Sequence, residues 1–198
     1  MKSISELMFW ISNGLLVPVI IGLLFFFFKV LLQAGSFFSH YLHRARREKQ
    51  VEAAMKEAAS ASALVSSLRD LPPTPCTAML LDLYASRDNP ARMARAISGY
   101  ELRADSELGK TRLPARFGPI LGLMGTLIPM GPALVGLSTG EITSMAYNMQ
   151  IVFATTVLGL LTGAIAYVII QVRQRWISSD LVNMDYLVDL LQQEQERS

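Results

Sequence analysis

Charged residues and cysteines are scarce in this sequence, and both shortages limit what the protein can be. Only 17% of the 198 residues are charged, against roughly 25% in an average soluble domain, while 52% are hydrophobic. Cys76 is the only cysteine, so an intrachain disulfide and a CxxC metal site are excluded; we interpret it as a loop thiol beside a proline-rich turn. The net charge of +2, without a long basic run, gives nucleic-acid binding little support.

Charge is also missing locally. Between Phe117 and Val172 the only charged side chain is Glu141, whereas the stretch from Arg44 to Arg116 carries most of the acids and bases. Such segregation separates lipid-embedded from water-exposed segments. The apolar stretches on either side of Glu141 contain no carboxylate, histidine or cysteine, so a charged or metal catalytic centre has no candidates there. We expect no enzymatic activity, no metal and no cofactor.

Three stretches are long and apolar enough to cross a bilayer, at residues 7–28, 117–138 and 144–172. The first continues past Lys29, whose long stem is expected to lift its ammonium group to the lipid headgroups. Its basic cluster follows the apolar core instead of preceding it, so we interpret it as a retained helix and not as a signal peptide.

The basic flanks of these spans predict an orientation. Arg112 and Arg116 precede the second span, and Arg173 and Arg175 follow the third, with Trp176 as an interfacial anchor. We therefore expect a multi-pass inner-membrane protein with an extracytoplasmic N-terminus and a cytoplasmic C-terminus. The expected parts are residues 1–39 with the first span, a cytoplasmic helical domain at 40–116, a membrane hairpin at 117–172 and a cytoplasmic helix at 173–198.

The water-exposed segments predict further helices, which makes the fold all-α. Residues 45–68 contain no glycine or proline and end at a proline-rich turn, residues 71–75. Two more helices are expected at 76–86 and 90–108, the second capped by Asn89 with Pro90 in its first turn. After the third span, a heptad pattern indicates packing within an oligomer, although a helix packed on its own cytoplasmic domain would show the same stripe; the pattern comprises Ile177, Leu181, Met184, Val188 and Leu191.

Small residues and prolines line one face of the second span at steps of three and four: Gly118, Gly122, Gly125, Pro129, Pro132 and Gly136. Small residues let helices approach closely in lipid, and prolines free backbone carbonyls. In the third span Gly159, Gly163 and Ala166 accompany three threonines, Thr155, Thr156 and Thr162, while Thr126 lies beside the stripe of the second span. Such threonines commonly bond only to their own backbone, but their clustering on two facing helices makes that explanation weaker and indicates a hydroxyl-bearing surface.

A threonine hydroxyl cannot itself take up a proton and release it near neutral pH. If protons cross here, the titrating group comes from another chain, which predicts a partner with an intramembrane acid.

Two segments resemble a known family. Residues 119–126, PILGLMGT, are similar to the Pro-x-x-Gly-Leu-x-Gly-Thr opening of the second helix in ExbB and TolQ proteins, and residues 154–160, ATTVLGL, resemble that family's third helix. The resemblance, to the ExbB, TolQ and MotA proton-channel (stator) family, implies a pentamer around an ExbD- or TolR-like subunit whose aspartate carries protons past Thr126 and Thr156. It further implies that Pro119, Gly122, Gly125, Pro129, Pro132, Gly159 and Gly163 pack helices or face the partner.

The chain departs from the family pattern at several positions. Ile151 stands where members often carry glutamate, and Ile165 where they often carry proline. Pro129 and Pro132 are also unlike the classical import subunits, which points to a divergent member. A non-conducting oligomeric scaffold that uses the same small-residue faces is the alternative. A small secondary transporter is disfavoured by three spans without a visible inverted repeat.

Overall fold

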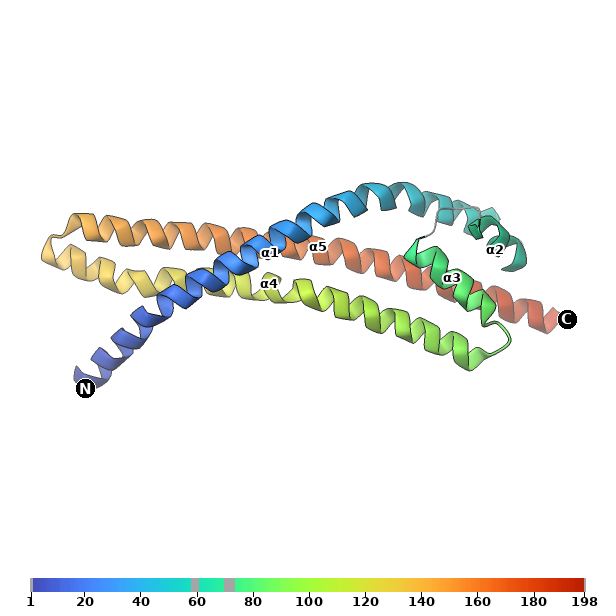
Figure 1. Ribbon diagram of the computed structural model, residues 1–198, viewed down its shortest axis with the longest axis horizontal. Helices are drawn as coiled ribbons and strands as arrows, with labels where there is room; N and C mark the ends of the chain where they lie inside the picture. Colours follow the sequence, from blue (N-terminus) through green and yellow to red (C-terminus); the bar gives the residue numbers. More distant parts are fainter. Residues whose placement is uncertain (1, 58–60, 70–73, 198) are drawn as a thin grey trace. The chain divides into compact units, whose positions relative to one another are not determined.

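The computed structural model describes residues 2–57, 61–69 and 74–197, and within these ranges the chain forms helices and no strand. The helices are α1 (Lys2–Glu57), α2 (Ala61–Arg69), α3 (Pro75–Ala85), α4 (Pro90–Thr139) and α5 (Ile142–Arg197) (Figure 1). The predicted all-α class is confirmed. Helices α1, α4 and α5 are each long and apolar enough to cross a membrane, as the three predicted spans require.

Local sequence chemistry sets the helix ends. Helix α4 begins at Pro90, where the Asn89 side chain accepts a hydrogen bond from the backbone N–H of Arg92 at 3.2 Å, as predicted. Helix α3 begins at Pro75 behind a reciprocal cap in which the hydroxyls of Thr74 and Thr77 each accept the other residue's backbone N–H, a cap the sequence analysis did not identify.

The long helices run further than predicted. The expected helix at 90–108 and the span at 117–138 are one helix, α4, which passes through four prolines; the span at 144–172 and the C-terminal helix are likewise one helix, α5. In lipid a broken helix would leave more backbone groups unpaired than a proline does, so an uninterrupted helix is favoured. The predicted helix at 45–68 corresponds to the end of α1 and to α2, with residues 58–60 between them outside the described residues. Residues 70–73, which include most of the predicted turn, also lie outside the described residues.

The chain divides into two compact units. Unit 1 comprises Met1–Ser36 and Gly109–Ile170, and unit 2 comprises Phe37–Leu108 and Gln171–Ser198. In unit 1, α4 and α5 form an antiparallel hairpin, seen as the yellow and orange arms of Figure 1. The hairpin turns at Gly140, whose φ of 78° suits glycine, so the predicted turn beside Glu141 is confirmed.

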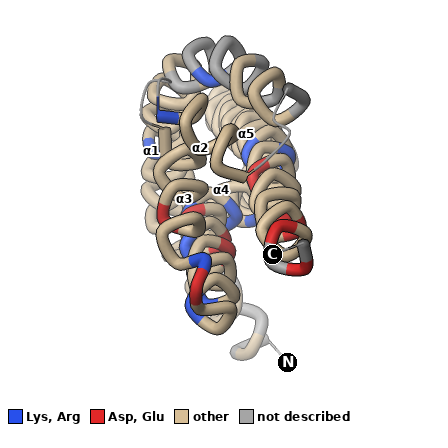
Figure 2. The backbone as a smooth tube through the Cα atoms, turned by 90° about the vertical axis from the view of Figure 1, so that its right-hand side faces the viewer, with Lys and Arg blue, Asp and Glu red and all other residues tan. Residues whose placement is uncertain are grey.

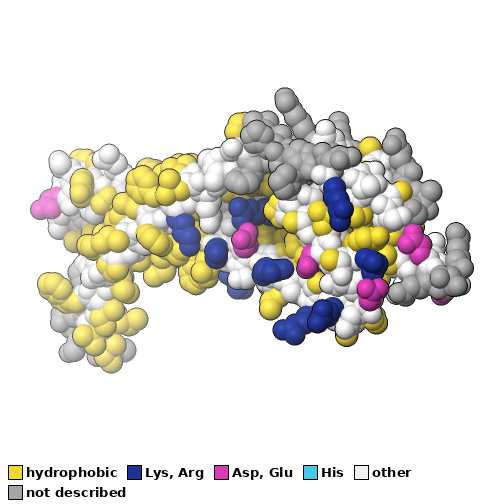
Figure 3. Space-filling model, turned by 45° about the vertical axis from the view of Figure 1, so that its right-hand side comes forward, with side chains coloured by type: hydrophobic (Ala, Val, Ile, Leu, Met, Phe, Trp, Pro, Cys, Tyr) yellow, Lys and Arg dark blue, Asp and Glu magenta, His cyan; other side chains and the backbone are white. Residues whose placement is uncertain are grey.

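Hydrophobic side chains cover much of unit 1. Large exposed apolar residues occur on all three of its helices, among them Phe25, Leu123 and Leu160. Figure 3 shows a wide yellow surface that carries few charged side chains. Exposed apolar area of this extent suits contact with lipid or with other membrane helices.

Unit 2 has a hydrophobic core of its own, to which α2 contributes Leu64 and Leu68 and α3 contributes Leu80 and Leu83. Charged residues recur along its helices, where water solvates them (Figure 2). The buried stripe of α5 in this core consists of Asp180, Met184, Leu187 and Leu191.

That stripe corrects the interpretation of the C-terminal heptad. Met184 and Leu191 are buried in one core with residues of α1, α2, α3 and α4 of the same chain, and Leu187, which the heptad omitted, is fully buried with them. Val188 is only half-buried. The periodicity therefore reflects packing on the chain's own unit 2, and assigning these positions to an oligomer seam was wrong.

Candidate functional site

The candidate site is the hairpin of unit 1, where α4 and α5 approach until their backbones touch. A β-carbon placed on Gly159 would lie 2.7 Å from the Cα of Gly122 and 2.8 Å from the carbonyl oxygen of Gly118. Only glycine fits such a crossing without moving a helix. The predicted small-residue stripe of α4 is thus the surface against which α5 packs.

Two of the predicted pathway threonines lie inside this crossing. A β-carbon on Gly125 would lie 2.8 Å from the Cβ of Thr155, and one on Gly118 would lie 3.0 Å from the Cβ of Thr162. Both threonines are buried. Thr155 and Thr162 therefore fill the space opposite glycines and hold the two helices in register.

The predicted prolines take different places in the hairpin. The Pro119 ring packs on Gly163, where a β-carbon would lie 2.6 Å from the proline Cγ. Pro129 is buried and Pro132 is half-buried. Gly136 packs beside the turn, because a β-carbon there would lie 3.3 Å from the carbonyl oxygen of Glu141.

Thr126 and Thr156, the other two predicted pathway residues, are half-buried and share one side of the hairpin. Gly125 and Thr155 face each other across the two helices. Thr126 follows Gly125 and Thr156 follows Thr155, and one residue corresponds to a rotation of about 100° around the helix axis. Because the helices are antiparallel, that step carries both residues to the same side. The next residues after the facing pair Gly118 and Thr162 behave in the same way: Pro119 and Gly163 lie on this same side of the hairpin and contact each other.

Helix α1 covers the opposite side of α4. The ring of Phe26 stacks on Phe117 with centroids 6.2 Å apart, and a β-carbon on Gly22 would lie 3.4 Å from Leu121. Phe117 and Leu121 each precede a facing glycine of α4 by one residue, so they point away from the side of Thr126. The side with Thr126 and Thr156 is bordered instead by exposed apolar residues, including Leu123, Val157 and Leu160.

All four threonine hydroxyls donate to carbonyls of their own helix. Thr126 donates to Leu123 at 2.7 Å and Thr156 to Val152 at 2.7 Å, while Thr155 and Thr162 donate to Ile151 and Leu158. A hydroxyl whose hydrogen is used in this way still accepts hydrogen bonds on its oxygen. Thr126 and Thr156 can therefore receive a proton donor on their half-buried side, but neither can act as an acid.

The hairpin itself supplies no titrating group along this surface. Its single charged residue between Phe117 and Val172, Glu141, is exposed at the turn. Among the described residues, no group of three His, Cys, Asp or Glu side chains could hold a metal ion.

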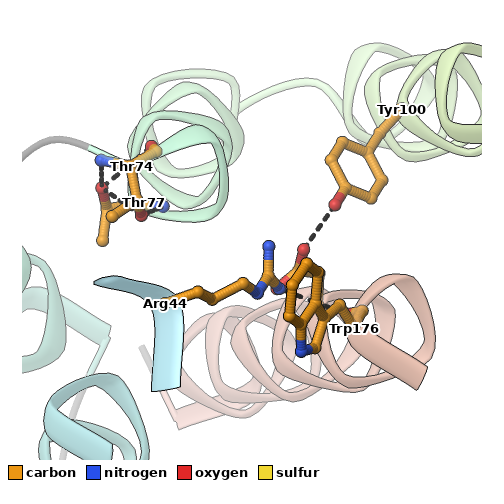
Figure 4. Close-up of polar contacts among 6 residues, drawn as sticks. Arg44, Thr74, Thr77, Tyr100 and Trp176 are labelled. Carbon is orange, nitrogen blue, oxygen red and sulfur yellow. Dashed lines mark hydrogen bonds and ion pairs between the residues drawn. The ribbon is translucent and has the colours of Figure 1, made fainter. Parts of the chain in front are cut away.

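A second polar cluster, in unit 2, was missed by the sequence analysis. The Asp180 carboxylate is 4% exposed; it accepts hydrogen bonds from Arg44 on α1 and from the Tyr100 hydroxyl on α4, each at 2.5 Å. Arg44 also donates to the carbonyl of Trp176 at 3.3 Å and lies over the Trp176 ring (Figure 4). The signal that could have revealed it is an acid four residues before Met184 on a buried stripe.

The surroundings of Asp180 disfavour ionisation of its neighbours. Burial, together with the negative charge of Asp180, raises the pKa of the Cys76 thiol to about 12. Burial and the hydrogen bond to Asp180 raise the pKa of Tyr100 above its ordinary range. Cys76 is therefore a buried residue in the first turn of α3, and its interpretation as a loop thiol was wrong.

Trp176 also differs from a free interfacial anchor. Its ring stacks on Phe37 and Tyr41 of α1, with centroids 5.4 and 5.9 Å apart. These contacts tie α1 to α5 within unit 2.

A family of known proteins matches a stretch of the chain that includes the hairpin. The family model described as the MotA/TolQ/ExbB proton channel family matches residues 78–185, which is more than half of the chain. No curated protein matches the chain closely enough to be counted as a relative. Three membrane-length apolar helices and this match make the chain a multi-pass membrane protein. The chain belongs to the MotA/TolQ/ExbB proton channel family.

Proposed function

We propose that the chain is the channel subunit of a motor that uses the proton-motive force of the inner membrane to drive work across the cell envelope. The observation that carries this proposal is the side of the hairpin that presents Thr126 and Thr156 together, away from α1. Membership of a proton channel family supports it. The protein acts by conducting ions, without enzymatic activity or a cofactor.

The partner follows from the chemistry of that surface. Two hydroxyl oxygens that accept hydrogen bonds, on a hairpin surface without a carboxylate or histidine, require an acid from another chain. An ExbD- or TolR-like subunit with an intramembrane aspartate supplies this acid. In its protonated form the aspartic acid donates a hydrogen bond to the oxygens of Thr126 and Thr156. Each proton that crosses a potential of 100 mV releases about 2.3 kcal/mol, so work is accumulated over several protons.

The proposed assembly is a pentamer that encloses the partner's membrane helices. Proteins of this family form oligomeric channels. The exposed apolar residues beside Thr126 and Thr156 suit burial against neighbouring copies and the partner. In this assembly the N-terminus is extracytoplasmic and unit 2 is cytoplasmic, since the positive flanks of the spans lie on that side.

Replacing Thr156 by valine tests the pathway, because valine keeps the shape and removes the acceptor oxygen. We expect Thr156→Val to reduce partner-dependent proton flux at least tenfold while the complex still assembles, and Thr156→Ser to retain flux. The measurement is acidification of proteoliposomes that contain the complex.

Thr139→Val is the matched control, since Thr139 makes the same kind of bond to its own backbone but lies at the turn. Its flux should equal that of the unmodified complex. Full flux in Thr156→Val would contradict the pathway. Unchanged biological function without a membrane potential would favour the non-conducting scaffold.

A further inference from the structure

Two polar atoms lie buried in unit 1 without a hydrogen-bond partner among the described residues: Oε1 of Gln33 and Oγ1 of Thr111. Thr111 is 0% exposed. Its hydroxyl differs from those of Thr126, Thr155, Thr156 and Thr162, which all bond to their own helix. Buried polar groups in native proteins are nearly always paired, with protein or with ordered water, so these two atoms call for an explanation.

Gln33 continues the buried stripe of α1. The stripe runs through Val19, Leu23, Phe26 and Val30 at steps of four and three, and the next step reaches Gln33. The contacts of Phe26 with Phe117 and of Gly22 with Leu121 show that α1 and α4 are antiparallel in constant register. The same register brings Gln33 to the turn of α4 that carries Lys110 and Thr111.

Thr111 continues the stripe of α4 that faces α5. It precedes Gly118 by seven residues, or two turns, and the register set by Gly118 with Thr162 places it opposite Ile169 and Ile170. Both isoleucines are buried and apolar, so their side chains offer Thr111 no partner. The two registers therefore place Gln33 and Thr111 at the same level of unit 1.

A third polar atom lies in the same turn. Pro114 has no N–H, so the carbonyl oxygen of Lys110, four residues earlier, loses its usual helical donor. Lys110 precedes Phe117 by seven residues and shares its side of α4, the side that α1 covers. The register thus places three oxygen atoms, from Gln33, Thr111 and Lys110, at the level of the same turn of α4.

We propose that these three atoms hold a bound water molecule. Buried waters make about three hydrogen bonds to groups that would otherwise be unpaired, which matches this set: a water donates to the Gln33 and Lys110 oxygens and pairs with the Thr111 hydroxyl. Three neutral oxygens can also coordinate a cation. The positive charges of Lys29, Lys110, Arg112 and Arg116 outnumber the negative charges of Asp105 and Glu107 within about two turns of the site, which disfavours a cation and leaves water.

The water replaces the hydrogen bond that Pro114 removes. It lets α4 pass Pro114 as a helix although the site is enclosed by apolar residues. This role concerns the packing of unit 1 and does not depend on ion conduction by the side of Thr126 and Thr156.

Solid-state NMR of the unmodified full-length protein in lipid bilayers tests the site directly, by magnetisation transfer from water to threonine side chains. Thr162 is the internal reference, since it is equally buried but donates to Leu158. We expect transfer to Thr111 to be several-fold faster than to Thr162. Transfer to Thr111 that is no faster than to Thr162 overturns the proposal. A shift of the Thr111 signals when Na⁺ and K⁺ are replaced by choline assigns the site to a cation and also overturns it.

Thermal unfolding gives a second test, in which the sign of the change in unfolding midpoint distinguishes the two possibilities. If a water bridges the three atoms, Thr111→Val leaves its remaining partners unpaired and lowers the unfolding midpoint by roughly 3 °C or more, while Thr111→Ser largely retains it. If the hydroxyl is simply unpaired, valine removes a buried polar group and the midpoint stays or rises, which contradicts the site. If Gln33 and Thr111 share one water, the double variant of Gln33→Leu and Thr111→Val should lower the unfolding midpoint by less than the sum of the two single variants. Additive decreases contradict a shared water.

Discussion

At the scale of single residues, the hairpin depends on the absence of side chains at a few positions. Gly122 and Gly159 bring the backbones of α4 and α5 together, and Thr155 and Thr162 fill the places opposite Gly125 and Gly118. This close packing fixes which residues face away from the crossing. Thr126 and Thr156 are presented on one side because their neighbours in sequence are held inside.

Adding one methyl group at the crossing tests this account. Gly159→Ala places a β-carbon 2.7 Å from the Gly122 Cα, so a helix must move, and we expect a loss of about 1–3 kcal/mol in the free energy of unfolding. Gly131→Ala is the control, because nothing lies within 4 Å of a β-carbon there. That variant should be neutral or stabilised by up to about 1 kcal/mol. Equal stability of the two variants, measured by thermal unfolding in detergent, would show that the crossing is not tight.

The buried thiol beside Asp180 predicts a pH dependence. Folding raises the pKa of Cys76 from 9.0 to about 12, so the fold favours the neutral thiol. This contribution to stability is complete below pH 9 and is lost as the pH rises toward 12; Tyr100, whose pKa is also raised, acts in the same direction. We expect the unfolding midpoint to fall from about pH 9 upward, and to fall less steeply in Cys76→Ala. Parallel pH curves for the two proteins would refute the assignment.

At the scale of helices, local rules predicted some boundaries but not the continuity of the long helices. Asn89 with Pro90 marked the start of α4, and Gly140 marked the turn of the hairpin. The predicted break between residues 108 and 117 was wrong: Pro114 lies there, but it removes only one backbone hydrogen bond, and packing lets α4 continue through it as it does through the prolines of the predicted span. The cap of α3 could have been found from the spacing of Thr74 and Thr77.

The end of α5 shows a different limit of sequence reasoning. A heptad shows that one face of a helix is buried, but not which partner buries it, and here the core of the chain's own unit 2 does so. Arg44 and Asp180 are 136 residues apart in sequence, so nothing local indicated that they pair.

Shortening one core side chain of α5 tests the corrected assignment. Leu187 is fully buried in unit 2, so Leu187→Ala should lower the free energy of unfolding by about 2–5 kcal/mol. Val182→Ala removes a similar group from the exposed face and should change it by less than about 0.5 kcal/mol. The measurement is thermal or denaturant unfolding followed by circular dichroism. Similar losses in both variants would indicate that α5 buries a different face.

At the scale of the whole molecule, hydropathy and motif spacing were sufficient to predict three membrane-length helices and the family. They also selected the threonines and glycines of the hairpin. The division of those residues between the crossing and one open side could not be predicted, because it depends on the register of two helices that only tertiary packing fixes. The resulting account treats the chain as part of an ion path that a partner's acid completes.

Proton flux into proteoliposomes, with and without the partner, tests that account most directly. The chain reconstituted alone should conduct no more protons than empty vesicles under an imposed membrane potential, because no carboxylate or histidine lies along the hairpin beside Thr126 and Thr156. Adding a co-purified single-helix subunit with an intramembrane aspartate should produce flux that is lost when the aspartate is replaced by asparagine. Flux through the chain alone, or flux that survives this replacement, would contradict the account.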